Sequence, residues 1–136
     1  MAYLVKVGFF KPRMLDETAV MSLAGFFRAV RFGADEAHGV NNLMYYNFLK
    51  EQGVYSFDSA SEIFTVDVKK FLHAVTELAR QVLLIEATGD YDAAVKFKAT
   101  YGKMPAEAQT VLKKLEDIPV DVRPIYVSAE KLKKRK

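Results

Sequence analysis

Along most of the chain, apolar residues recur at steps of three and four positions, which is the spacing of an amphipathic helix. The first such stretch covers residues 16–32, and Gly33 follows it as a stop signal. A second covers residues 35–52, with Asp35 as the expected N-cap and Gly53 just beyond its end. The first part of the chain therefore predicts two helices joined by a short turn.

The pattern then changes to two short runs of β-branched and aromatic residues, Val54–Phe57 and Ile63–Val66. A turn rich in Ser and Asp, residues 58–61, separates them. Runs of this kind on either side of a polar turn predict a small β-hairpin.

The longest periodic stretch follows the predicted hairpin. It begins after Asp67, an expected N-cap, and continues to about Ala87. Gly89 and Asp90 predict the end of this helix and the cap of a short fourth helix that closes near residues 100–102.

A fifth helix is expected from Pro105 to about Leu115, and two prolines favour an extended segment from Asp117 onward. The predicted fold is therefore mainly α: a compact helical domain of about five helices with a small β-hairpin and an extended C-terminal segment. We expect a single domain over residues 1–129, followed by a basic tail at 130–136.

Composition fits a folded domain, since 51% of the residues are hydrophobic and 27% are charged. No apolar run approaches the roughly 18 residues of a membrane-spanning helix, and the first seven residues are too polar for a signal peptide. Without cysteine the chain has no disulfide and no thiolate zinc site. We expect a cytoplasmic protein with no membrane partner.

The net charge of +3 comes from the tail, which holds five basic residues and one acidic residue. The remainder keeps 15 of the 20 basic and 16 of the 17 acidic residues, so the body is close to neutral. A solvated terminus is the simplest interpretation of the tail, and a nucleic-acid or targeting role is the alternative. The body lacks a basic stripe with interleaved aromatics, so no nucleic-acid partner is expected.

Motifs for metal, phosphate or nucleophile chemistry are missing from the sequence. His38 and His73 are the two histidines, and no second histidine follows either at the spacing of a zinc helix. His73 and Glu77 share a helix face, where a surface pair is the simpler interpretation than a metal clamp. There is no glycine-rich phosphate loop and no GxSxG turn. We therefore expect no metal ligands in this chain.

One polar cluster stands out at the predicted helix–helix junction, where Arg28, Arg31, His38 and Asn42 surround a glycine. Such side chains can hydrogen-bond a peptide backbone or a developing oxyanion, and Asn42 lies one helical turn after His38. The alternative is structural: the arginines pair with local carboxylates and His38 satisfies a helix N-terminus.

The segment 23–53, which contains this cluster, resembles the dipeptidyl peptidase III family and is most like its bacterial members. An arginine-rich helix leads to a glycine, an alanine–histidine step and a helix that ends in an asparagine–phenylalanine pair. The likeness continues at residues 88–91, 98–102 and 118–121. In that family an HExxGH helix and a glutamate from a second helix hold zinc, and both precede the matching region. Neither motif is present here, so the resemblance implies a C-terminal piece that is not catalytic alone, with zinc in the parent enzyme.

The resemblance also implies roles for individual residues. His38 matches a histidine of the substrate cleft and is the candidate catalytic residue, which would hydrogen-bond the scissile carbonyl or its oxyanion. Asn42 stands where many members have an arginine. Arg31 matches the family pattern, which assigns it no role. Asn42 and Arg31 of the polar cluster are the candidate substrate-binding residues. Ala34 and Ala37 are small enough to let the two helices approach closely.

The implied parent removes dipeptides from the N-termini of peptides, and its N-terminal catalytic part and the peptide substrate are the expected partners. One alternative is a non-enzymatic helical interaction module that self-associates through the stripe of the third helix and exposed aromatic residues. The aromatics in question are Tyr45, Tyr46, Phe48, Phe57 and Phe64. The other alternative is the C-terminal part of a nudix-fused protein, although the glutamate-rich nudix signature is missing.

Overall fold

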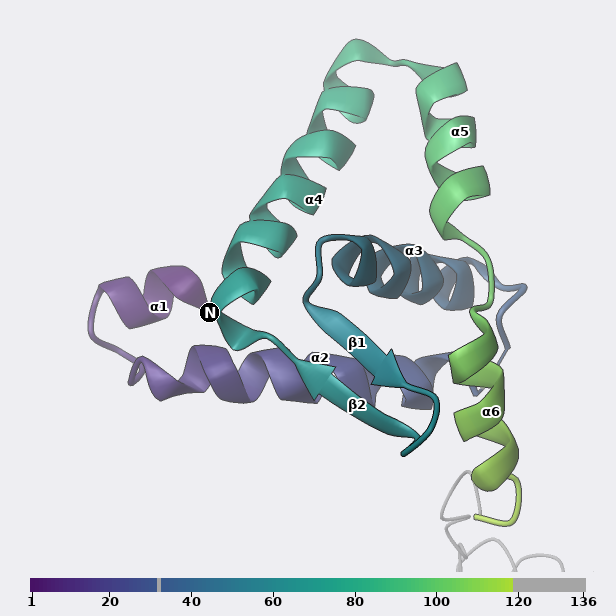
Figure 1. Ribbon diagram of the computed structural model, residues 1–136. Helices are drawn as coiled ribbons and strands as arrows, with labels where there is room; N and C mark the ends of the chain where they lie inside the picture. The colour runs from purple at the N-terminus through teal and green to yellow at the C-terminus, as the bar shows by residue number, and fades with distance from the viewer. Residues whose placement is uncertain (32, 119–136) are drawn as a thin grey trace, which may run out of the picture.

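The computed structural model describes residues 1–31 and 33–118 of the chain. Within them it has six helices and one two-stranded antiparallel sheet, which confirms the mainly helical prediction and the hairpin (Figure 1). The elements are α1 (Ala2–Lys6), α2 (Arg13–Val30), α3 (Ala37–Glu51), β1 (Tyr55–Asp58), β2 (Ile63–Val66), α4 (Val68–Thr88), α5 (Tyr91–Tyr101) and α6 (Ala106–Lys114).

The predicted caps of the long α4 helix are confirmed. The Asp67 carboxylate accepts hydrogen bonds from the backbone N–H groups of Lys69 and Lys70, at 3.1 and 3.4 Å. Gly89 ends the helix in the left-handed conformation, with a φ of 64°, where a side chain would be strained. Asp90 then caps α5 by accepting from the Ala93 N–H at 2.9 Å.

At the N-terminal side the structure has one helix that was not predicted, and two predicted boundaries were wrong. The short α1 helix was not predicted; it has no side-chain cap and buries no residue. Helix α2 begins at Arg13 instead of near residue 16, because Pro12 supplies the start. Helix α3 begins at Ala37 with Glu36 as its N-cap, so the assignment of Asp35 to that position was wrong.

The predicted extended C-terminal segment begins differently from the expectation. Asp117 and Ile118 lie in a turn after α6, where the Ile118 N–H donates to the Leu115 carbonyl at 3.1 Å. The rest of that segment and the basic tail at 130–136 lie outside the described residues.

Helix α3 is the centre of the fold and packs against α2, α4, α5 and β1. Its apolar residues lie on more than one face, as expected for a helix that is covered on several sides. Tyr46 of α3 is stacked between Phe26 of α2 and Tyr55 of β1, with ring centroids 4.2 and 5.5 Å apart and interplanar angles of 13°. This aromatic stack joins three elements into one core.

Helices α4 and α5 form an arm that extends away from the rest of the fold and turns at residues 88–90 (Figure 1). The base of the arm is packed, since Phe71 and Ala74 of α4 are buried. In α5, Phe97 and Tyr101 pack against Phe48 of α3. Among the described helices none is long and apolar enough to cross a membrane.

Candidate functional site

The link between α2 and α3 is held by a close backbone contact. An added Cβ on Gly39, in the first turn of α3, would overlap the Gly33 carbonyl oxygen and lie 2.9 Å from the Cα of Ala34. Gly33 has a φ of 132°, a conformation that L side chains rarely adopt. The close approach therefore depends on Gly39, while Ala34 packs against the core and Ala37 is exposed. The expected contribution of Ala37 to this approach was wrong.

His38 is exposed at the start of α3. Asn42, one turn later, donates its amide N–H to the His38 backbone carbonyl at 2.7 Å, which confirms that the two share a helix face. No hydrogen bond or ion pair of the His38 imidazole is found among residues 1–31 and 33–118. The imidazole is thus available to a partner, while the Asn42 amide is used to brace the helix.

Arg31 immediately follows α2 and reaches across to the end of α6. Its guanidinium donates from Nη2 to the backbone carbonyls of Leu115 and Ile118. These carbonyls lie beyond the last full turn of α6, where a cationic side chain is a favourable hydrogen-bond donor. The arginine therefore holds the end of α6. Its partners are backbone carbonyls and not the local carboxylates that the structural alternative had predicted.

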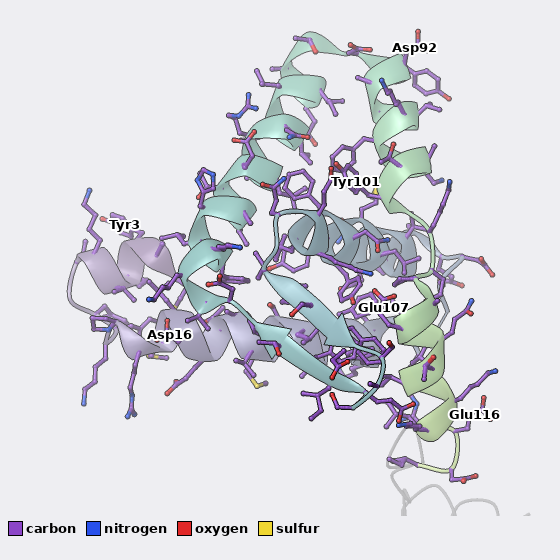
Figure 2. All side chains as sticks on the ribbon, in the orientation of Figure 1. Tyr3, Asp16, Asp92, Tyr101, Glu107 and Glu116 are labelled. Atoms are coloured by element: carbon purple, nitrogen blue, oxygen red, sulfur yellow. The ribbon has the colours of Figure 1, made fainter. Side chains whose placement is uncertain are left out.

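A second polar group lies at the other end of α6. Glu107, in the first turn of α6 (Figure 2), accepts a hydrogen bond from the Tyr46 hydroxyl at 3.0 Å and forms an ion pair with Lys50. The Glu107 side chain is 11% exposed and Tyr46 is 1% exposed, so the carboxylate and the phenol are largely shielded from water, while the Lys50 side chain is 41% exposed.

The protonation of this group follows from its contacts. Burial alone would raise the pKa of Glu107, but the hydrogen bonds from Lys50 and Tyr46 and the lysine charge together lower it. Burial and the Glu107 charge raise the pKa of Tyr46 above its ordinary value. Glu107 is therefore charged and Tyr46 is neutral, and their hydrogen bond holds α6 against α3.

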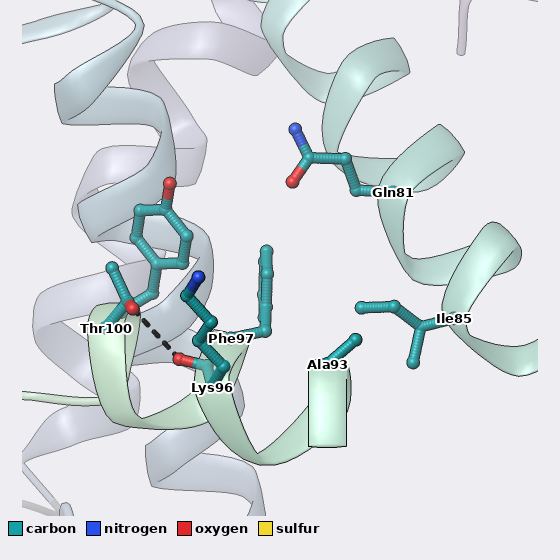
Figure 3. A pocket seen from close by; sticks show the side chains of 7 residues that line it. Gln81, Ile85, Ala93, Lys96, Phe97 and Thr100 are labelled. Atoms are coloured by element: carbon teal, nitrogen blue, oxygen red, sulfur yellow. Dashed lines mark hydrogen bonds between the residues drawn. The ribbon is translucent and has the colours of Figure 1, made fainter. Parts of the chain in front are cut away.

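A shallow hollow of about 340 Å³ lies between α4 and α5 (Figure 3). Gln81 and Ile85 line it from α4, and Phe97 and Tyr101 are among the α5 residues on the opposite side. Burial and the neighbouring Glu51 raise the pKa of Tyr101 to about 12, so its phenol is protonated at neutral pH. The hollow is suited to an apolar side chain more than to acid–base chemistry.

The considered metal pair, His73 and Glu77, is not part of a larger cluster. Arg80 donates to both carboxylate oxygens of Glu77 at 3.0 Å and lowers the pKa of this group. Within the described part of the chain, no group of three or more His, Cys, Asp or Glu side chains is placed to hold a metal ion. The carboxylate of Glu77 is therefore engaged by Arg80 of the same helix.

The asparagine–phenylalanine pair of the matching segment has a structural role. The Asn47 amide donates to the carbonyls of Tyr101 and Lys103, both at 2.7 Å, and so fixes the end of α5. Phe48 is 0% exposed and packs against Phe97 and Tyr101.

The aromatic residues expected on an exposed interaction surface are mostly inside. Tyr46 and Phe48 are buried, and Tyr45, Phe57 and Phe64 are half-buried, so this part of the interaction-module interpretation was wrong. The Tyr46–Glu107 contact was not predicted either. It joins residues 61 positions apart, and no local pattern marks such a pair.

Comparison with known proteins gives three partial matches. Nudix hydrolase 3 of Arabidopsis thaliana is 36% identical over 132 residues, which are 96% of this chain and 17% of that protein. The structure of DPP III from Caldithrix abyssi superposes with a TM-score of 0.88 at 36% identity, over 96% of this chain and 25% of that one. Dipeptidyl-peptidase III from Corallococcus sp. strain EGB gives 0.84 at 34% identity, over 98% and 25%.

None of the known protein-family models matches this chain. The chain spans 25% of the length of both solved peptidase chains and 17% of the plant protein. At these identities and TM-scores, the likeness extends through nearly all of this chain in both sequence and fold.

Proposed function

From the premise that this chain is similar in sequence and fold to about a quarter of a dipeptidyl peptidase III, we propose that it is the C-terminal part of such a zinc peptidase. In this role it forms one wall of the cleft where dipeptides are removed from peptide N-termini. The observation that carries the proposal is the TM-score of 0.88 at 36% identity over 96% of the chain.

His38 is the residue through which this wall acts on the substrate. Its imidazole is exposed in the first turn of α3 and has no hydrogen bond or ion pair to another described residue. A ring N–H in that position can donate to the scissile carbonyl, and more strongly to the oxyanion that develops from it. Asn42 acts on this group indirectly, because its amide braces the His38 carbonyl at 2.7 Å. Arg31, which holds the end of α6, keeps a candidate substrate-binding role through its other N–H groups.

Zinc belongs to the remainder of the parent enzyme in this proposal. The described residues offer no cluster of three metal ligands, and the full sequence has two histidines and no cysteine. A metal supplied elsewhere in the polypeptide would activate the attacking water, while this chain contributes orientation and hydrogen bonding.

A graft tests the role of His38. The matching quarter of the Caldithrix abyssi DPP III is replaced by this chain, and kcat/KM is measured on a dipeptidyl arylamide. His38→Ala should lower kcat/KM by about 100-fold, the effect of losing one oxyanion donor. His73→Ala, on the exposed surface of α4, is the matched control and should leave the rate unchanged. Equal rates for the two variants would remove His38 from the mechanism.

The likeness to Nudix hydrolase 3 of Arabidopsis thaliana supports a second candidate, in which the chain is part of a nudix-linked protein. The chain itself lacks the glutamate-rich nudix signature, so that activity would lie in another part of such a protein. Under either candidate we expect no magnesium-dependent hydrolysis of a nucleoside diphosphate derivative by the isolated chain. A measured rate that chelation of magnesium abolishes would contradict the placement of that activity outside this chain.

A further inference from the structure

Helix α4 carries more apolar surface than its packing inside the fold uses. One face holds Phe71 and Ala74, which are buried against the core. A neighbouring face, here called the outer stripe, is exposed to solvent. The outer stripe consists of Leu72, Thr76, Ala79 and Leu83.

The spacing of the outer stripe is that of a helix-packing seam. Its members follow one another at steps of four, three and four, so they lie in one row along the helix. Leu72 is 43% exposed and Leu83 is 61% exposed. The row spans about 16 Å at the rise of an α-helix, which is about three turns.

The polar group within the stripe is already satisfied by its own helix. The Thr76 hydroxyl donates to the Leu72 carbonyl at 2.8 Å, so a partner that covers the stripe leaves no unpaired hydroxyl. Ala79, in the middle of the row, leaves room for the backbone of a neighbouring helix. The stripe therefore has the chemistry of a dry helix–helix contact.

We infer that the outer stripe of α4 is covered by an amphipathic helix from the remaining part of a DPP III-like polypeptide; this inference rests on the proposed function. The solved chains that this protein matches are about four times as long as the matched part, which is 25% of each. A helix of the same polypeptide is held at high effective concentration, and so it occupies the stripe in preference to a second copy of the chain.

The test compares Leu83→Asp with Leu84→Asp in two settings. Leu84 is 50% exposed and is the next residue on α4, turned about 100° away from Leu83 around the helix. In the isolated chain both variants should unfold within about 2 °C of the parent, because both positions face water. In the graft described above, Leu83→Asp should lower Tm by about 5 °C or more while Leu84→Asp leaves it unchanged.

Each of the remaining outcomes either supports or overturns the inference. A Leu83→Asp graft that does not fold, beside a Leu84→Asp graft that does, supports the inference. Equal Tm values for the two grafts overturn it. An isolated chain that is dimeric by light scattering, and that Leu83→Asp makes monomeric, overturns it in favour of a second copy. This test measures thermal stability. The test of the cleft measures how His38→Ala changes kcat/KM, so either test can fail without the other.

Discussion

At the scale of single residues, the α2–α3 link depends on the missing side chain of Gly39. The chain turns at Gly33, and its backbone then passes so close to the first turn of α3 that a Cβ on Gly39 cannot be placed without a shift. His38 is the preceding residue, so the position of its imidazole depends on this contact. The sequence showed small residues around the turn, but it could not show which of them touches backbone.

Two alanine substitutions distinguish the steric requirement at Gly39 from the general effect on stability of replacing a glycine in a helix by alanine. Gly39→Ala should lower the free energy of unfolding by about 3 kcal/mol, because the backbone of residues 33–34 must move. Gly25→Ala, inside α2, should raise it by about 0.5–1 kcal/mol, since an added Cβ there meets no atom within 4 Å. Urea unfolding followed by circular dichroism measures both. Equal stability of the two variants would contradict the close contact.

At the scale of elements, polar groups fasten α6 at both of its ends. Glu107 in its first turn bonds to Tyr46 and Lys50 of α3, and the carbonyls after its last turn accept from Arg31. An ion pair between Lys114 and Glu62 of the hairpin adds a third attachment, which is exposed and therefore weak.

The attachment of α6 should weaken in acid. The pKa of Glu107 is lowered in the folded state, so its contribution to stability is present above the ordinary value of 4.5 and is lost as the pH falls through the folded value. Urea unfolding between about pH 3 and pH 7 measures the effect. The unmodified chain should lose stability below pH 4.5 more steeply than the Glu107→Gln variant, because glutamine carries no charge that can titrate.

A second glutamine variant provides the control for this measurement. Glu17→Gln alters a carboxylate on the exposed surface of α2, where the ion pair with Arg13 is weak. Its pH profile should follow that of the parent. A Glu107→Gln profile that also follows the parent would show that this carboxylate does not fasten α6.

At the scale of the whole molecule, the sequence predicted what local chemistry controls. Caps at Asp67 and Asp90 and the left-handed Gly89 placed the ends of α4 and α5 correctly, because each acts within a few residues. The start of α3 was not predicted correctly. The Asp35 side chain does not cap this helix, and the first turn is instead in close contact with the preceding turn at Gly39. The tie of Tyr46 to Glu107 was missed for the same reason: it exists only after folding.

The candidate site shows the same division. Sequence placed His38 and Asn42 on one helix face, and the structure confirms this through the bond from Asn42 to the His38 carbonyl. The two bonds from Arg31 to the end of α6 join residues 84 and 87 positions apart, so no local pattern could indicate them.

The activity of the graft itself tests the central claim most directly. With this chain in place of the matching quarter of the Caldithrix abyssi DPP III, kcat/KM on a dipeptidyl arylamide should stay within about tenfold of the parent enzyme, a difference of about 1.4 kcal/mol. That result would show that the chain can serve as the cleft wall of such an enzyme. A graft that folds and binds zinc but releases no dipeptide would contradict the account.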